Sequence, residues 1–153
     1  MPEVVFDCCC LSNFALSGSL AILKRLYGHS AFITDFVSAE IMRGIQSGYK
    51  DLGNIREAVA EGWLKELVLK SKEEKPLFET LSISLGLGEA SSIAIANTRG
   101  LLFACDDKTA RREAGRMGVK LSGTLGILKR AINDKVIELK EGNLILAKMK
   151  AYG

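Results

Sequence analysis

The sequence of 153 residues predicts an α/β fold in which helices cover both faces of a central, mainly parallel sheet. Short apolar runs alternate along the chain with longer segments of helical periodicity, an order typical of parallel strands joined by crossover helices. The clearest run, residues 101–105, contains no charged side chain, as expected for a strand buried on both faces. The length suits one domain, so we expect residues 1–153 to form a single unit.

Glycine, proline and capping residues mark the boundaries of the other elements. Gly28 ends the helical pattern of residues 11–26. Thr34 or Asp35 caps the helix after the second strand, and Pro76 opens a later helix. The expected strands are residues 3–6, 31–33, 63–69 (a strand or an edge hairpin), 101–105 and 119–121. The expected helices are residues 11–26 in two pieces, 36–46, 51–60, 76–85, 89–96, 108–114, 125–132 and 144–149.

The composition is that of an ordinary globular protein with a net charge of +3. No apolar run approaches the roughly 18 residues of a membrane helix, and the first residues lack the basic and apolar regions of a signal peptide. We therefore expect a cytoplasmic protein that does not associate with membranes. The cysteines at positions 8–10 and Cys105 match neither a disulfide framework nor a zinc-finger spacing, so we expect small buried thiols.

Five carboxylates occupy positions where charged groups are seldom found without compensation. Asp7 follows the first strand, and Asp106 and Asp107 follow the fourth. These three acids should lie at the carboxyl edge of the sheet, where open α/β folds bind ligands. Glu40 and Glu89 lie on or beside the apolar line of their helices. Each acid alone is compatible with a turn, a cap or a first helical turn, but together they predict a pocket that holds a divalent cation.

Four basic residues follow the acidic pair with helical spacing. They are Lys108, Arg111, Arg112 and Arg116. Their positions, i, i+3, i+4 and i+8, put them on one face of the helix, opposite small apolar residues. Such a run is commonly a solvated helix face. Beside a metal site, however, it favours binding of a nucleic-acid backbone.

Five segments carry a resemblance to a known family: Asp7 after residues 4–6, Glu40 within residues 37–41, and residues 86–90, 106–111 and 123–128. Together they resemble a PIN domain, most closely the branch of nucleic-acid-binding proteins similar to VapC toxins. The resemblance implies a three-layer α/β/α fold and a ribonuclease that depends on Mg²⁺ or Mn²⁺. It also implies catalytic, metal-binding carboxylates, which would be Asp7, Glu40, Glu89 and one of the pair Asp106 and Asp107.

The identity of the last ligand stays open at this point. If Asp107 is the N-cap of the next helix, Asp106 becomes the ligand, whereas the usual spacing in the family favours Asp107, which we adopt. Thr124 opens a helix, so we expect it to cap that helix, although its hydroxyl can also hydrogen-bond a metal-bound water. The resemblance further implies an RNA substrate, an antitoxin protein as partner, and a homodimer.

The sequence departs from the family pattern directly after Asp7. Most members have Thr or Ser there, whereas this chain has Cys8, Cys9 and Cys10. The departure motivates an alternative function, an RNA-binding or regulatory module that keeps the PIN-like scaffold but has weak or no nuclease activity. A receiver-like phosphoacceptor domain is less favoured, because it requires an acidic pair in one turn near the N-terminus, where only Asp7 is present. The single histidine, His29, excludes catalysis by a histidine pair.

Overall fold

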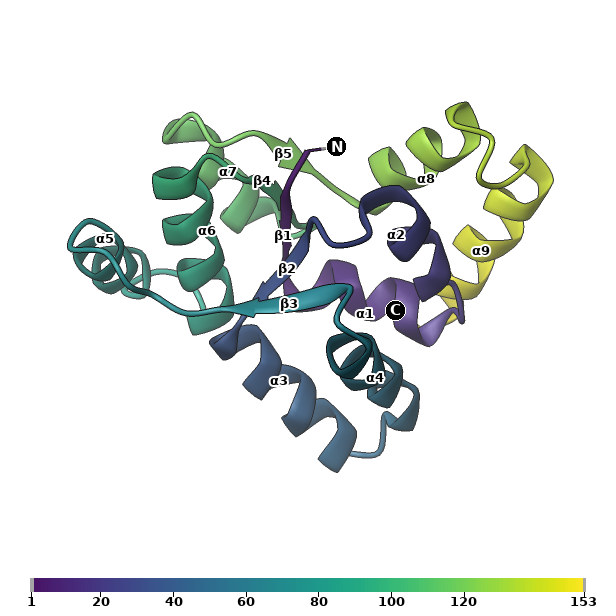
Figure 1. Ribbon diagram of the computed structural model, residues 1–153, viewed down its shortest axis with the longest axis horizontal. Helices are drawn as coiled ribbons and strands as arrows, with labels where there is room; N and C mark the ends of the chain where they lie inside the picture. Colours follow the sequence, from purple (N-terminus) through teal and green to yellow (C-terminus); the bar gives the residue numbers. More distant parts are fainter. Residues whose placement is uncertain (1, 153) are drawn as a thin grey trace.

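The computed structural model describes residues 2–152 and has a central sheet of five parallel strands between two layers of helices (Figure 1). The strand order is β3-β2-β1-β4-β5, and every neighbouring pair is parallel. The strands are β1 (Val4–Phe6), β2 (Ala31–Thr34), β3 (Leu64–Leu67), β4 (Leu102–Ala104) and β5 (Leu121–Ser122). The three-layer α/β/α fold expected from the sequence is thus confirmed.

The helices divide between the two faces of the sheet. Helices α5, α6 and α7 share one apolar core with the sheet, and α1, α2, α3, α4, α8 and α9 share the other (Figure 1). In the described residues they are α1 (Cys8–Leu16), α2 (Leu20–Tyr27), α3 (Asp35–Gln46), the 3-10 helix η1 (Lys50–Leu52), α4 (Gly53–Glu61), α5 (Glu74–Leu81), α6 (Leu87–Arg99), α7 (Lys108–Arg116), α8 (Thr124–Asn133) and α9 (Leu139–Tyr152). None of these helices has the length and apolar character needed to cross a bilayer.

The central strand shows how the sheet separates the two cores. Val4 and Phe6 of β1 point into the core beneath α1 and α2, whereas Val5 points into the core beneath α6. All three side chains are completely buried. Alternation with a period of two, with apolar residues on both faces, is what a strand covered by helices on each side requires.

The order of the strands creates a switch point between β1 and β4. From β1 the chain builds outward through β2 and β3, then returns across the sheet to form β4 and β5 on the other side of β1. Phe6 is in register with Ala104, and the amide of Asp7 donates a hydrogen bond to the carbonyl oxygen of Ala104 at 2.9 Å. The residues that follow β1 and β4 therefore lie side by side at the ligand-binding edge of the sheet.

Several helices begin earlier than the sequence predicts, and α5 and α9 show why. Helix α5 begins at Glu74, because the hydroxyl of Ser71 accepts the Glu74 amide at 3.1 Å while the Glu74 carboxylate accepts the Ser71 amide at 3.3 Å. This reciprocal capping places Pro76 inside the first turn. Helix α9 begins at Leu139 and passes through Gly142, where a Cβ would lie 3.0 Å from Ile132 Cδ1. That glycine allows close packing rather than breaking the helix.

Candidate metal centre

Four of the five predicted carboxylates converge between β1 and β4. Asp7 follows β1, Glu89 lies in the first turn of α6, and Asp107 precedes α7. Glu40 projects from α3 against the backbone of Gly88, the residue before Glu89. We call Asp7, Glu40, Glu89 and Asp107 the acidic centre.

The carboxylates of the acidic centre have little cationic compensation. Asp7 is only 2% exposed, and burial raises its pKa. Burial, followed by the negative charge of Asp7, raises the pKa of Glu40, an effect that Arg43 partly offsets. Burial, followed by the charges of Asp7 and Asp107, raises the pKa of Glu89 to about 7. Among the described residues, no salt bridge includes a member of the acidic centre. Crowded, desolvated carboxylates of this kind fit a hard divalent cation.

Gly88 allows α3 and α6 to approach closely enough for Glu40 to reach the centre. A Cβ at position 88 would overlap the Glu40 carboxylate and would lie 3.2 Å from Val37 Cγ2. The backbone N–H of Gly88 also donates to Glu40, which lowers the pKa of that carboxyl in part. Glycine is needed here for space rather than for an unusual backbone conformation.

A buried thiol belongs to the same site. Cys105 is fully buried, and its Sγ donates to Asp7 Oδ2 at 3.6 Å and accepts the amide of Asp107 at 3.4 Å. One ligand atom each from Asp7, Glu89 and Cys105 lie within 4.8 Å of one another. The sequence predicts Cys105 only as a small buried thiol. Its position directly before two acids places it at the edge of the site, but its contact with Asp7 depends on the pairing of β4 with β1. Buried thiols were also expected at positions 8–10, which was wrong for Cys9, because Cys9 is exposed.

Both members of the acidic pair act as helix caps. Asp107 is the N-cap of α7, and its Oδ2 accepts the amide of Ala110 at 2.9 Å. Asp106 is exposed and caps α8 from outside, because its Oδ1 accepts the amide of Thr124 at 2.8 Å. Capping therefore does not decide which of the two residues is the metal ligand. Asp107 is the one whose charge acts on Glu89, whereas Asp106 Oδ2 accepts from Asn13 Nδ2 at 3.1 Å.

The predicted capping role of Thr124 was wrong. Gly123 is the N-cap residue of α8 and has no side chain to offer, and Thr124 is the first helical residue. The nearly buried Thr124 hydroxyl donates to Asp106 and accepts from Asn13 Nδ2 at 3.2 Å. Asn13, which is not among the predicted site residues, thus joins Thr124 in fixing the Asp106 carboxylate.

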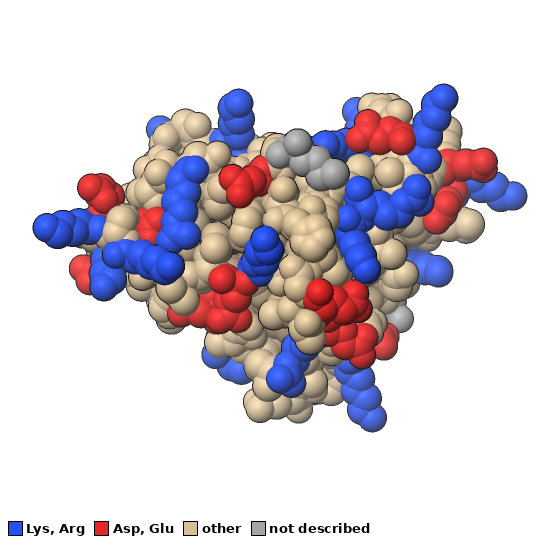
Figure 2. All heavy atoms as spheres, viewed as in Figure 1, with Lys and Arg blue, Asp and Glu red and all other residues tan. Residues whose placement is uncertain are grey.

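The predicted basic stripe lies on the outer face of α7, since Ala110 and Ala114 on the opposite face are fully buried. Lys108, Arg112 and Arg116 are exposed, and Arg116 pairs with Glu113 at 3.1 Å. On the face shown in Figure 2, basic and acidic side chains are interspersed, so the net positive charge is not concentrated there.

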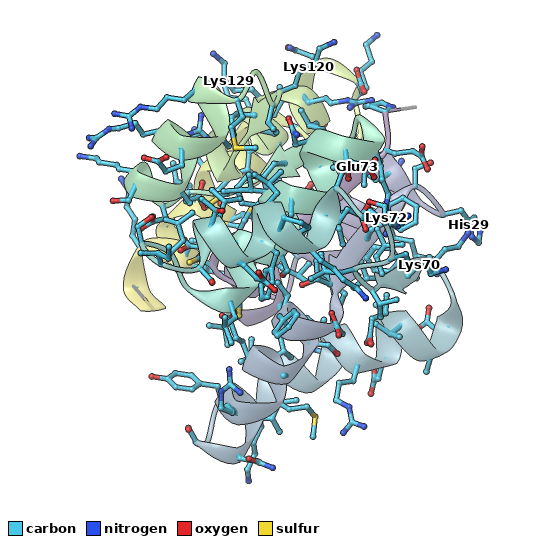
Figure 3. The ribbon with its side chains drawn as sticks, turned by 90° about the vertical axis from the view of Figure 1, so that its left-hand side faces the viewer. His29, Lys70, Lys72, Glu73, Lys120 and Lys129 are labelled. Carbon is cyan, nitrogen blue, oxygen red and sulfur yellow. The ribbon has the colours of Figure 1, made fainter. Side chains whose placement is uncertain are left out.

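Arg111 differs from the other residues of the stripe. It is partly buried, and its Nη1 donates to the carbonyl oxygens of Cys105 and Ser122, both at 2.7 Å. These bonds join the ends of β4 and β5. Two further lysines, Lys120 before β5 and Lys129 on α8, project into solvent at the top of the view in Figure 3.

A groove of about 770 Å³ lies beside the acidic centre. Asn13, Asp106, Arg111 and Thr124 contribute polar groups, and the remaining walls include Leu121, Leu125, Leu146 and Met149. His29 is exposed, and Figure 3 shows it projecting away from the ribbon. It precedes β2 and therefore lies at the amino edge of the sheet, whereas the acidic centre lies at the carboxyl edge.

Comparison with known proteins agrees with this arrangement. No curated protein matches the chain. A protein-family model described as a PIN domain, a fold of metal-dependent nucleases, matches residues 3–153. The match includes all five strands and every member of the acidic centre. The chain therefore belongs to the PIN domain family.

Proposed function

We propose that this protein is a ribonuclease that hydrolyses RNA phosphodiester bonds with the help of Mg²⁺ or Mn²⁺. The observation that supports the proposal most directly is the acidic centre itself, in which a nearly inaccessible Asp7 and two further carboxylates of raised pKa form no salt bridge with any described residue. A protein retains such uncompensated charge at a cost in stability, and binding of a divalent cation is the usual reason.

Different residues of the site would bind the metal, position its ligands and bind RNA. Asp7, Glu40, Glu89 and Asp107 would hold the ion as carboxylate ligands. A bound divalent ion supplies an activated water and neutralises charge on the phosphoryl oxygens. Gly88 positions Glu40, and the Asp107 amide and Cys105 fix the end of β4 against Asp7. The exposed side chains of Lys108 and Arg112 would contact RNA phosphates beside the centre.

We further propose an endonuclease that acts in the cytoplasm as the toxin of a toxin-antitoxin pair, as in the branch of the family similar to VapC. An antitoxin would cover the groove beside Asp106, and a homodimer is the proposed assembly. Exposed apolar side chains support a partner surface on α8 and α9, where Leu125, Leu139 and Leu144 are 61%, 63% and 60% exposed.

A nuclease assay on the purified chain tests the proposal. Structured and unstructured RNA, labelled at one end, would be incubated with Mn²⁺, with Mg²⁺, and with an excess of chelator. We expect internal cleavage that requires the metal and that stops in chelator. RNA that binds the protein but stays intact in Mn²⁺ would instead support the regulatory module, for which the run Cys8 to Cys10 after Asp7 is the motive.

A further inference from the structure

Beside the carboxylates of the acidic centre lies one donor that a magnesium site does not need. The thiol of Cys105 is 0% exposed and lies 3.6 Å from Asp7 Oδ2, and Glu89 brings a third ligand atom within 4.8 Å of both. Mg²⁺ and Mn²⁺ favour oxygen ligands, whereas sulfur favours zinc and other softer ions. The donor set of this chain is therefore mixed.

The spacing of these donors suits a tetrahedral ion. Zinc lies about 2.3 Å from sulfur and about 2.0 to 2.2 Å from carboxylate oxygen, so two donors of a tetrahedron are about 3.6 Å apart. The distance between Cys105 Sγ and Asp7 Oδ2 already has this value. Glu89 would have to move to bring its carboxylate to the same spacing, and its side chain is long and only partly buried. Three protein ligands with one position left for water are a common zinc arrangement.

A second observation points to a cation at this position. Asp7 is 2% exposed, and among the described residues no Lys, Arg or His forms an ion pair with it. Its Oδ2 instead accepts a weak hydrogen bond from the Cys105 thiol, and the Cys9 thiol and the backbone amides of Cys8 and Cys9 also hydrogen-bond to the carboxylate. Neutral thiols and amides compensate a buried carboxylate poorly, and one ion between Asp7 and Cys105 would satisfy both groups.

We propose that the acidic centre binds Zn²⁺ through Asp7, Glu89 and Cys105, and that Zn²⁺ bound in this way displaces the activating ion and holds the enzyme inactive. The inhibitory part of this inference rests on the proposed nuclease function. On coordination, the thiol S–H bond breaks, a Zn–S bond forms, and one proton is released to the buffer. No electron is transferred, and removal of zinc by a chelator restores the thiol.

Cys8 and Cys10 are the cysteines that suit a matched control. Cys8 Sγ is 3.8 Å from the hydroxyl of Ser12, and Cys10 Sγ accepts from Thr124 at the same distance, so both thiols have other partners. Cys8→Ser removes a thiol from the neighbourhood of Asp7 without removing one of the three proposed ligands. Cys105→Ser keeps an acceptor for the Asp107 amide and replaces the soft donor by a hard one.

Calorimetric titrations with Zn²⁺ and Mn²⁺ test the proposal on the wild type and both variants. We expect Cys105→Ser to lose at least the roughly tenfold in zinc affinity that removal of a supporting partner of a metal ligand costs. The Mn²⁺ affinities of both variants should stay within about threefold of wild type. This change is well below the loss of zinc affinity expected for Cys105→Ser. Co²⁺ provides an optical readout, because a cobalt-thiolate bond absorbs in the near ultraviolet, and this band should vanish only in Cys105→Ser.

The outcomes separate the two proposals. Wild-type protein that binds Co²⁺ without a thiolate band, or equal zinc affinity in wild type and Cys105→Ser, would overturn the zinc site and leave the nuclease untouched. A thiolate band in a protein that never cleaves RNA in Mn²⁺ would overturn the nuclease and leave the zinc site. Zinc inhibition that is as strong in Cys105→Ser as in wild type would overturn the inhibitory role. Should Cys105→Ser fail to fold by circular dichroism, the wild-type cobalt spectrum alone decides.

Discussion

Two buried carboxylates in this protein have opposite electrostatic surroundings. Glu74, 1% exposed, receives hydrogen bonds from Arg99 and Thr98 and from the amides of Lys70 and Ser71. The bond from Arg99, at 2.6 Å, is the largest of the causes that lower the Glu74 pKa to about 2. Asp7 is equally inaccessible, yet burial raises its pKa.

The contrast teaches that burial alone does not identify a functional acid. Glu74 is fully satisfied by the protein and fastens α5 to α6. Within the described part of the chain, Asp7 has no partner stronger than thiols and backbone amides, so it has capacity left for a ligand. Compensation, rather than depth, distinguishes the structural carboxylate from the candidate catalytic one, and the two should respond differently to substitution, pH and metal.

The largest expected effect is the loss of cleavage in Asp7→Asn. The change removes a central ligand, so metal-dependent cleavage should be abolished. Because it also removes an uncompensated charge, thermal unfolding in chelator should show equal or higher stability than wild type. Glu79→Gln, at an exposed position on α5, is the control and should leave both measurements unchanged. Full activity of Asp7→Asn would remove the acidic centre from the mechanism.

Glu74→Gln should have the opposite profile. It leaves the guanidinium of Arg99 without its charge partner in a partly buried position, which should cost roughly 2 to 4 kcal/mol of unfolding free energy. Cleavage per folded molecule should not change, because the Glu74 site is separate from the acidic centre. Urea unfolding followed by circular dichroism measures the first quantity. Stability equal to wild type would show that the buried ion pair of Glu74 with Arg99 does not stabilise the fold, and the comparison with Asp7 would then fail.

A smaller effect distinguishes the two members of the acidic pair. Asn is nearly as good an N-cap as Asp but a poor ligand in an anionic site, so Asp107→Asn should keep α7 intact and lose about tenfold or more in Mn²⁺ affinity. Asp106→Asn should have a milder effect on the metal. It would instead place an amide against Asn13 and Thr124, at a cost of about 1 kcal/mol in stability. Calorimetry that ranks the two losses in reverse order would move the ligand to Asp106.

In the presence of a chelator, Glu89 and Glu74 should make the stability depend on pH in opposite ways. The pKa of Glu89 rises from 4.5 to about 7 on folding, so its favourable contribution is present below pH 4.5 and is lost as pH rises through 7. The pKa of Glu74 falls from 4.5 to about 2, so its contribution is present above pH 4.5 and is lost as pH falls toward 2. In Glu89→Gln the decline between pH 4.5 and 7 should flatten, and an unchanged profile would contradict this account.

The smallest expected effect concerns the stripe on α7. The double change Arg112→Ala and Arg116→Ala should weaken RNA binding, and each lost phosphate contact should reduce the slope of log affinity against log salt by roughly 0.7. The matched control is Arg56→Ala with Lys65→Ala, which removes the same charge from exposed positions on α4 and β3. Equal slopes in the two double variants would show that the stripe does not contact RNA phosphates and is only a solvated helix face.

The sequence predicted those parts of the molecule that depend on local pattern. Apolar runs located the strands, and acids placed after them predicted the carboxyl edge where Asp7 and Asp107 lie. The helix of Glu74 was misjudged at its start, although the pattern Ser71-x-x-Glu74 is a recognisable capping box.

Contacts between distant segments could not be predicted in this way. Glu74 pairs with Arg99 because α5 packs against α6, and Glu40 lies against Gly88 because α3 packs against α6. No local sequence pattern predicts how these helices pack. The same holds for Cys105, whose thiol became part of the centre only when β4 was placed beside β1.

The pairing of β1 with β4 also determines when the centre can exist. Asp7 and Cys105 are 98 residues apart in the chain, and β4 must be present before the sheet can close between them. Closing a loop of that length is entropically costly, and contacts so distant in sequence form late in folding. A nascent chain emerging from the ribosome carries Asp7 and Glu40 early but has no partner strand for them. Translation itself therefore delays assembly of the centre until most of the protein has been synthesised.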